Sequence, residues 1–165
     1  AETVRMRDLS YGGDSDRIGG TFNQETSAIV LYNRSDPRTV IHEYGHAVDF
    51  SLSNDMTMLG HTPLKPEAGI WRKAMESEYR SSYERALVIA DLPGSTVFSV
   101  AESKINDVAQ FIPAVSTYSL ANEREWFAEG WKEYHSGRGA RSAMKLKIPK
   151  TFRFIEGLSK GVLFS

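Results

Sequence analysis

Cysteine is absent from the 165 residues of this sequence, which excludes disulfide bonds and thiolate metal sites. No apolar run approaches the length of a membrane span, so a transmembrane segment is not expected. A strong charge of either sign is also lacking, because 20 Lys and Arg residues stand against 21 Asp and Glu residues. With 41% hydrophobic and 25% charged residues, and no repeat or linker, the sequence predicts one soluble globular domain over residues 1–165.

What the sequence does contain is a His-Glu-x-x-His motif, from His42 to His46, in a segment whose apolar residues recur at helical spacing. Asp36 and Pro37 before it are typical of a helix start. Residues four apart on a helix lie one turn above each other, so both histidines can reach one tetrahedral Zn²⁺. Glu43 would then lie beside the metal, where it can take a proton from water. The motif predicts a hydrolytic site, and the alternative is a surface helix with two solvated histidines.

A zinc site needs a third protein ligand, and two candidates follow downstream. Asn122 with Glu125 three residues later is typical of the start of a helix. Glu125 and Glu129 are one turn apart on that helix and share a face. One carboxylate could complete the zinc shell, while the other accepts the outward N–H of a ligating histidine. The alternative is an acidic first turn that complements the helix dipole.

Several stretches together resemble the catalytic domain of anthrax lethal factor and its secreted single-domain relatives, the Pro-Pro endopeptidases. They are residues 42–49 (HEYGHAVD), 118–131 (YSLANEREWFAEGW), 149–155 (PKTFRFI) and, for that family's hairpin, 20–31 (GTFNQETSAIVL). The resemblance covers residues from about 18 to 50 and from 117 to 165, in the same order. Residues 52–116 are not covered and look like an insertion or a divergent helical region.

The resemblance implies a zinc metalloendopeptidase of the gluzincin type. By position, His42, His46 and Glu125 would bind one Zn²⁺, and Glu43 would be the general base. Tyr118, seven residues before the glutamate ligand, would stabilise the oxyanion or donate a proton. Glu129 would be the acid that supports a ligating histidine. The residues by themselves could not have selected the tyrosine.

Upstream of the motif, β-branched and aromatic residues on both sides of a short polar connection predict a hairpin over residues 21–32. Residues 4–9 alternate like a short strand. In zinc peptidases the sheet edge above the active-site helix commonly takes the substrate as an added strand. We therefore expect one hairpin strand to bind an extended peptide through Gly19, Gly20, Thr21 and Phe22. The two glycines would allow close backbone approach, or they form an ordinary flexible turn.

The expected fold class is α+β, a zincin-like domain in which a small mixed sheet with a substrate-binding edge strand packs on the active-site helix. Residues 1–50 would hold the sheet and the motif helix, 51–116 a divergent helical region, and 117–165 the glutamate-ligand helix and a C-terminal helix. Within the middle region, helical spacing predicts helices over about 66–90 and 97–111. Tyr118 would then be delivered from a loop.

The chain turns basic near its end, where residues 136–165 contain seven Lys or Arg residues and one acidic residue. These bases are dispersed through an amphipathic tail, which favours a solvated helix face over a nucleic-acid surface. The apolar residues expected to dock on the core are Met144, Leu146, Ile148, Phe152, Phe154, Ile155, Leu158 and Val162.

The predicted function is a secreted, monomeric, zinc-dependent endopeptidase acting on peptide bonds in protein substrates, with Pro-Pro bonds as the preference that kinship implies. The start at Ala1 without a signal peptide is compatible with a mature secreted product or an excised part. No nucleic-acid partner and no membrane span are expected. Three alternatives remain: the catalytic domain of a lethal-factor-like toxin that cleaves host signalling proteins, a non-catalytic interaction module stabilised by zinc, and a nucleic-acid binder that uses the basic tail.

Overall fold

The computed structural model describes residues 4–6, 20–23, 28–31, 36–53 and 64–164. Helices predominate in these ranges, and the strands are three or four residues long. The elements are β1 (Val4–Met6), β2 (Gly20–Asn23), β3 (Ala28–Leu31), α1 (Pro37–Ser53), α2 (Glu67–Ile89), α3 (Phe98–Asp107), the 3-10 helices η1 (Ala109–Phe111) and η2 (Tyr118–Leu120), α4 (Glu123–Tyr134), α5 (Arg138–Lys147) and α6 (Pro149–Ser159). Among the described residues, no helix is both long and apolar enough to cross a membrane.

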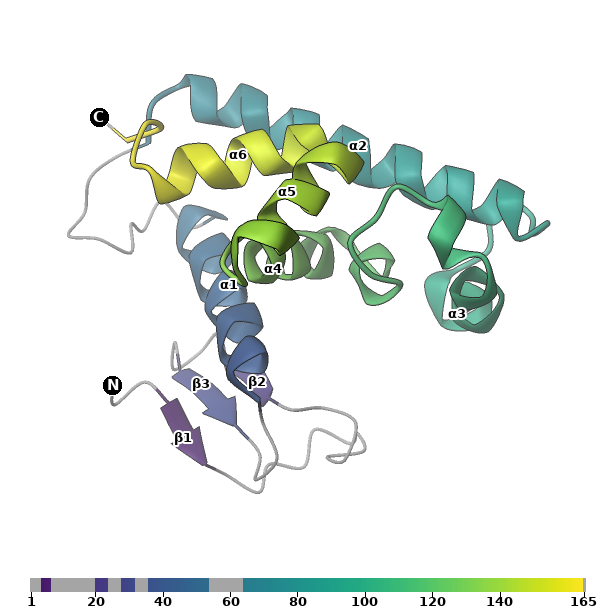
Figure 1. Ribbon diagram of the computed structural model, residues 1–165, viewed down its shortest axis with the longest axis horizontal. Helices are drawn as coiled ribbons and strands as arrows, with labels where there is room; N and C mark the ends of the chain where they lie inside the picture. The colour runs from purple at the N-terminus through teal and green to yellow at the C-terminus, as the bar shows by residue number, and fades with distance from the viewer. Residues whose placement is uncertain (1–3, 7–19, 24–27, 32–35, 54–63, 165) are drawn as a thin grey trace.

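The predicted α+β fold class is wrong, because the described part of the chain is mainly helical. The strands pair in the order β1-β3-β2, with β1 parallel and β2 antiparallel to β3. Figure 1 shows them gathered beneath one end of α1, whereas the other helices extend away from that end. Helix α1 contacts β2 and β3, but the described core is built between helices.

Both helix starts that the sequence predicts around the motif segments are confirmed. At the start of α1, the Asp36 Oδ1 atom accepts a hydrogen bond from the Thr39 backbone N–H at 3.0 Å. At the start of α4, the Asn122 Oδ1 atom accepts one from the Glu125 backbone N–H at 2.9 Å. These side chains satisfy N–H groups that have no partner within the helix, so each helix begins directly after its capping residue.

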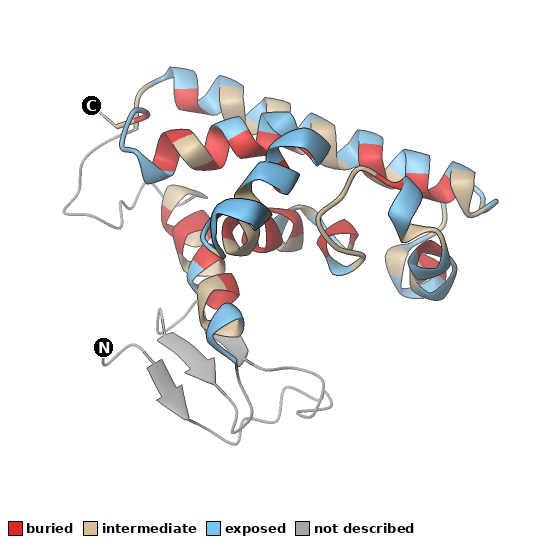
Figure 2. Ribbon diagram, in the orientation of Figure 1, coloured by how far each residue is buried: buried red, intermediate tan, exposed pale blue. Residues whose placement is uncertain are grey.

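The helix expected over residues 66–90 is α2, and the one expected over 97–111 is split into α3 and η1. The described core lies where α2, α4 and α6 meet, and Figure 2 shows buried positions along the facing sides of these helices. Its largest fully buried side chains include Met75 and Leu87 of α2, Trp126 and Phe127 of α4, and Phe154 and Ile155 of α6.

The basic tail forms α5 and α6, and most of its apolar residues dock on the core as predicted. Two do not, since Leu146 is 85% exposed and Val162 is 52% exposed. Met144 is the buried residue of α5, and a residue two positions further along a helix points to the opposite side. Leu146 therefore cannot share the buried face with Met144.

The N-terminus of α6 is capped by a side chain from α2. The Glu78 carboxylate accepts hydrogen bonds from the Lys150 N–H at 3.0 Å, the Thr151 N–H at 2.8 Å and the Thr151 hydroxyl at 2.7 Å. The same Thr151 oxygen accepts the indole N–H of Trp126 at 2.8 Å. A negative charge at this position also complements the helix dipole. This cap ties α2, α4 and α6 together beside the core.

Candidate metal centre

Helix α1 directs the motif side chains toward α4. His42 is 8% exposed and Glu43 is 5% exposed, so both lie in the contact between the two helices. Gly45 permits that contact, because a Cβ atom there would lie 3.0 Å from the Ala128 Cα and 3.0 Å from the Trp131 Cβ. A side chain at this position would push the helices apart. The glycine thus sets how closely the motif approaches α4.

The two motif histidines and Glu125 form a compact group of possible metal ligands. One ligand atom from each lies within 4.8 Å of the others. Glu125 Oε1 is 2.7 Å from His46 Nε2, and Glu125 Oε2 is 3.3 Å from His42 Nε2. Oε2 is buried but makes no hydrogen bond within the described part of the chain. Two imidazole nitrogens and a carboxylate oxygen are therefore gathered around one point, as a divalent metal requires.

Glu129 is the second acidic residue of the predicted pair, and it contacts the outward nitrogen of the His42 ring. Its Oε2 atom is 2.8 Å from His42 Nδ1 and 2.8 Å from Lys132 Nζ. Its Oε1 atom accepts a hydrogen bond from the Ser116 hydroxyl at 2.7 Å. The carboxylate fixes the ring and leaves Nε2 directed at Glu125.

The helix start predicted from Asn122 and Glu125 forms through the Asn122 side chain. Asn122 caps the helix, but the Glu125 side chain turns to the histidines.

The ionisable groups of the site shift one another's pKa values. Burial alone would lower the pKa of His42, but Glu125 and Glu129 raise it to about 9. Burial alone would raise the pKa values of both carboxyls, yet His42 and His46 lower that of Glu125 to about 2. His42 and Lys132 do the same for Glu129, whose pKa is also about 2. Both carboxylates are thus ionised at neutral pH and available to a cation and to its ligand.

Glu43 differs from the other two acids. Its Oε1 atom is 3.9 Å from His42 Nε2, too far for a hydrogen bond. Burial raises the pKa of Glu43, and the nearby histidines only partly oppose that effect. A buried carboxylate with a raised pKa beside the ligand group is a better proton acceptor than an ordinary glutamate.

Tyr118 lies next to His42. It begins the 3-10 turn η2, whereas an irregular loop was expected. Its ring centroid is 6.2 Å from that of His42, and the residue is 49% exposed. Partial burial and the neighbouring Glu125 carboxylate raise the pKa of its hydroxyl. The group therefore stays protonated at neutral pH and can donate a hydrogen bond.

Of the residues predicted to bind substrate, Gly20, Thr21 and Phe22 lie on β2, and Gly19 is outside the described residues. Strand β2 is at one end of the sheet and lies next to α1. Its outer edge pairs with no strand that the structure describes.

Sequence reasoning missed Ser116, Lys132 and the structural role of Gly45. A glycine inside an apolar helix was the one available signal, because it destabilises a helix unless close packing requires it. Ser116 and Lys132 carried no signal, since their contacts depend on how distant segments meet.

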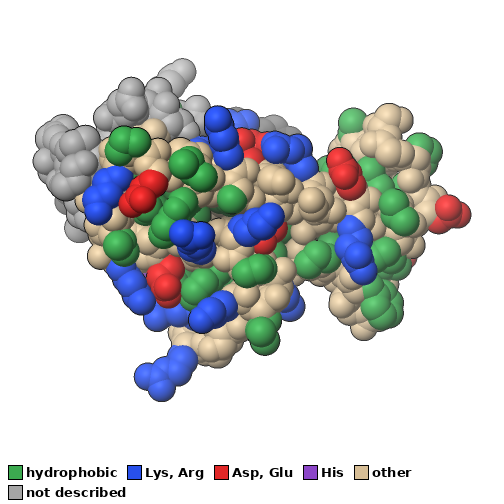
Figure 3. Space-filling model, turned by 90° about the horizontal axis from the view of Figure 1, so that it is seen from above, with side chains coloured by type: hydrophobic (Ala, Val, Ile, Leu, Met, Phe, Trp, Pro, Cys, Tyr) green, Lys and Arg blue, Asp and Glu red, His purple; other side chains and the backbone are tan. Residues whose placement is uncertain are grey.

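The basic tail lies away from this site, on the face made by α2, α5 and α6. Figure 3 shows Lys and Arg side chains dispersed over this face among hydrophobic and acidic ones. Three of the bases stack on aromatic rings: Arg141 on Tyr134, Lys145 on Phe152 and Arg153 on Trp71. These cation–π contacts are internal to the protein, so the three bases contribute to packing within the fold.

Together these observations define a helical protein with a two-histidine, one-glutamate group suited to a divalent metal. The family model described as anthrax toxin lethal factor, N- and C-terminal domain, matches residues 24–158, and the chain belongs to this family. No curated protein and no solved structure gives a significant match.

Proposed function

We propose that this protein is a zinc-dependent endopeptidase. The observation that carries the proposal is the convergence of His42, His46 and Glu125 from two helices, with Glu43 buried beside them. A hydrolytic metal site needs three protein ligands, a vacant coordination position and a proton acceptor within reach. The residues present supply the ligands and the acceptor.

Zinc suits this donor set better than harder cations do. Imidazole nitrogens favour transition metals, whereas Ca²⁺ and Mg²⁺ are bound mainly by oxygen atoms. The buried Glu125 Oε2 atom, which has no hydrogen-bond partner among the described residues, is the kind of acceptor that a cation would satisfy. When bound, Zn²⁺ supplies a Lewis acid that polarises a carbonyl and lowers the pKa of water to about 7.

The chain's own residues then divide the work. The Glu43 carboxylate accepts a proton as water attacks the peptide carbonyl carbon, and it returns the proton to the leaving amine nitrogen when the C–N bond breaks. The Tyr118 hydroxyl donates a hydrogen bond to the carbonyl oxygen as negative charge develops there. Glu129 holds the His42 ring through Nδ1. The products are a carboxylate and an amine, as hydrolysis requires.

The substrate would be a peptide bound in extended form along β2. Strand β2 is an edge strand of the described sheet, and it lies next to the motif helix. An added peptide strand would pair through main-chain hydrogen bonds and pass the site. Secretion is the localisation that fits a lethal-factor-like family, and both Pro-Pro peptides and host signalling proteins are substrates to test.

Replacing a ligand tests the site most directly. Glu125→Ala should lose stoichiometric zinc and cleavage of a combinatorial peptide library, both measured on the purified protein. Glu123→Ala is the matched control, because Glu123 is on the same helix turn but its carboxylate pairs with exposed Arg80 at 3.4 Å and not with the histidines. Unchanged zinc affinity in Glu125→Ala would contradict the ligand set. Stoichiometric zinc without any cleavage in the unmodified protein would instead favour the interaction module.

A further inference from the structure

Ser116 connects the two parts of the proposed site that come from different segments. Its hydroxyl donates a hydrogen bond to Glu129 Oε1 at 2.7 Å and accepts one from the Ser119 backbone N–H at 3.1 Å. The Ser119 hydroxyl in turn donates to the Ser116 carbonyl oxygen at 2.6 Å. A single side chain therefore joins the turn that carries Tyr118 to the carboxylate that holds His42.

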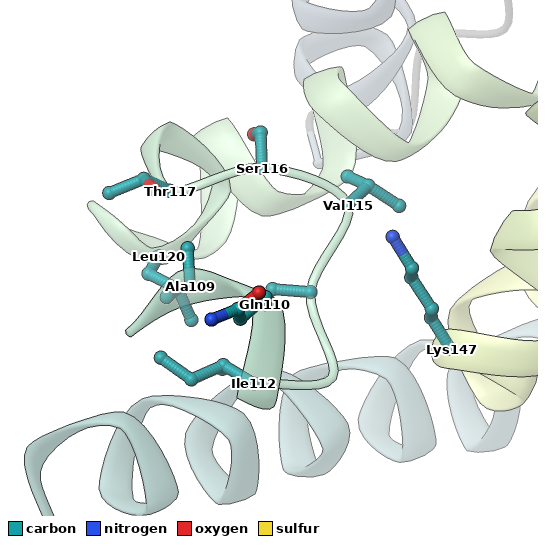
Figure 4. Close-up of a pocket in the computed structure, with 9 residues that line it drawn as sticks. Ala109, Gln110, Ile112, Val115, Ser116, Thr117, Leu120 and Lys147 are labelled. Atoms are coloured by element: carbon teal, nitrogen blue, oxygen red, sulfur yellow. The ribbon is translucent and has the colours of Figure 1, made fainter. Parts of the chain in front are cut away.

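Helix α2 holds the two ends of this segment, because the Ser82 hydroxyl donates to the Pro113 carbonyl at 2.7 Å and the Tyr79 hydroxyl donates to the Leu120 carbonyl at 3.2 Å. A pocket lies beside residues 112–117, bordered by Gln110, Ile112, Val115 and Lys147 among others. Figure 4 shows the Ser116 side chain pointing away from these residues. Ile112 is buried in the core, and Ala114 and Val115 pack against it. Between this anchored part and the turn η2, the Ser116 side chain supplies the hydrogen bonds that orient η2 relative to Glu129.

We propose that Ser116 is a positioning residue that keeps the Tyr118 hydroxyl in register with the metal ligands. This inference rests on the proposed function but assigns a role that the motif does not carry. None of the hydrogen bonds described for Ser116 joins it to a proposed metal ligand. Ser116 acts through Glu129 on one side and through the turn η2 on the other.

A double-mutant cycle tests whether Ser116 acts through Tyr118. Ser116→Ala should lower kcat about 10- to 100-fold, the size expected when a reacting group is misplaced by about 1 Å, with KM and zinc affinity little changed. Tyr118→Phe should lower kcat by about 100- to 1000-fold, as the loss of one oxyanion donor does. Once Tyr118 lacks its hydroxyl, Ser116→Ala should lower kcat little further, because both substitutions remove the same contribution of the Tyr118 hydroxyl. Additive effects would overturn the proposal.

Two variants serve as matched controls. Thr117→Ala removes a neighbouring hydroxyl that bonds to Asn106 at the surface, so kcat should be unchanged. Ser116→Thr keeps the hydroxyl and should recover most of the activity that Ser116→Ala loses. Failure of this rescue together with a loss of kcat in Thr117→Ala would show that any change in the segment disturbs the site, which would overturn the specific role of Ser116.

Amide hydrogen exchange tests the same inference without any peptidase assay. In the zinc-loaded protein, Ser116→Ala should speed exchange at Leu120 and Ala121, whose N–H groups bond to the Thr117 and Tyr118 carbonyls and not to Ser116. Faster exchange in a protein that cleaves no peptide would support the positioning role and refute the peptidase. Unchanged exchange with unchanged kcat would overturn the positioning role alone.

Discussion

The contact between α1 and α4 differs in kind from the contact between α2 and α6. The first buries ionisable groups, with His42, Glu43 and Glu129 each 8% exposed or less. The second buries apolar groups, such as Met75 of α2 and Ile155 of α6. Burying a charge costs several kcal/mol, and pairing it with an opposite charge does little more than repay that cost, so the first contact gains little net stability from its charges. We infer that the α2–α6 contact contributes chiefly to stability, while the α1–α4 contact also places groups for chemistry.

Arg72 and Asp49 join the two contacts. Arg72 of α2 lies 2.7 Å from the Asp49 carboxylate of α1, one turn beyond the motif. Asp49 is buried, so this ion pair fixes the end of the motif helix to the stabilising pair of helices. Helix α1, which carries the motif, is thus held in place by a residue of α2 that is not part of the site.

Glu43→Gln should give the largest effect, and it should fall on chemistry alone. The amide keeps the shape of the side chain but cannot accept a proton, so turnover should fall by about 100- to 10,000-fold. Zinc content, measured by atomic absorption, and the free energy of unfolding should stay near those of the unmodified protein. Glu43 makes none of the described short contacts with the ligands, which is why zinc should remain. Retained turnover would remove Glu43 from its proposed role.

Two glycines allow the contacts to be compared with the same substitution. Gly45→Ala would press against the Ala128 backbone between α1 and α4, whereas Gly157→Ala would come within 2.7 Å of Trp71 at the α2–α6 contact. Each should lower the free energy of unfolding by about 1–3 kcal/mol through overpacking. Only Gly45→Ala should also weaken zinc binding, about tenfold or more, because it moves the ligand helices apart.

Chemical denaturation and zinc titration would measure both quantities. Gly69→Ala on α2 is the control, since nothing lies within 4 Å of a Cβ atom at that position. Equal loss of zinc affinity in the Gly45 and Gly157 variants would break the distinction between the two contacts.

Glu78→Ala should give the smallest effect, on stability and not on the site. It leaves two backbone N–H groups and a hydroxyl at the start of α6 without their acceptor. The expected cost is about 1–2 kcal/mol in the free energy of unfolding, typical of a lost helix cap. Glu78→Gln keeps an acceptor oxygen and should cost less. Thermal melts with and without zinc would measure both, and a change in zinc affinity would contradict the separation proposed here.

Much of the helical arrangement was predictable, because local signals mark it. Asp36 and Asn122 cap the helices that follow them, and proline precedes α2 and begins α6. The fold class was not predictable in the same way. Strand-like composition upstream of the motif predicts an α+β fold, but the described strands are only three or four residues long and helices make up most of the described chain. The prediction that Leu146 docks on the core was wrong, because the apolar residues of an amphipathic tail need not all share one face.

The sequence by itself determined that His42 and His46 stand one turn apart with Glu43 between them, because helix geometry fixes that spacing. It also narrowed the third ligand to two carboxylates on one face of α4. Only the tertiary structure decided that Glu125 meets the Nε2 atoms, that Glu129 meets Nδ1, and that Ser116 reaches Glu129. Those contacts depend on how closely and at what rotation α1 lies against α4. That placement comes from packing around Gly45, which sequence spacing does not encode.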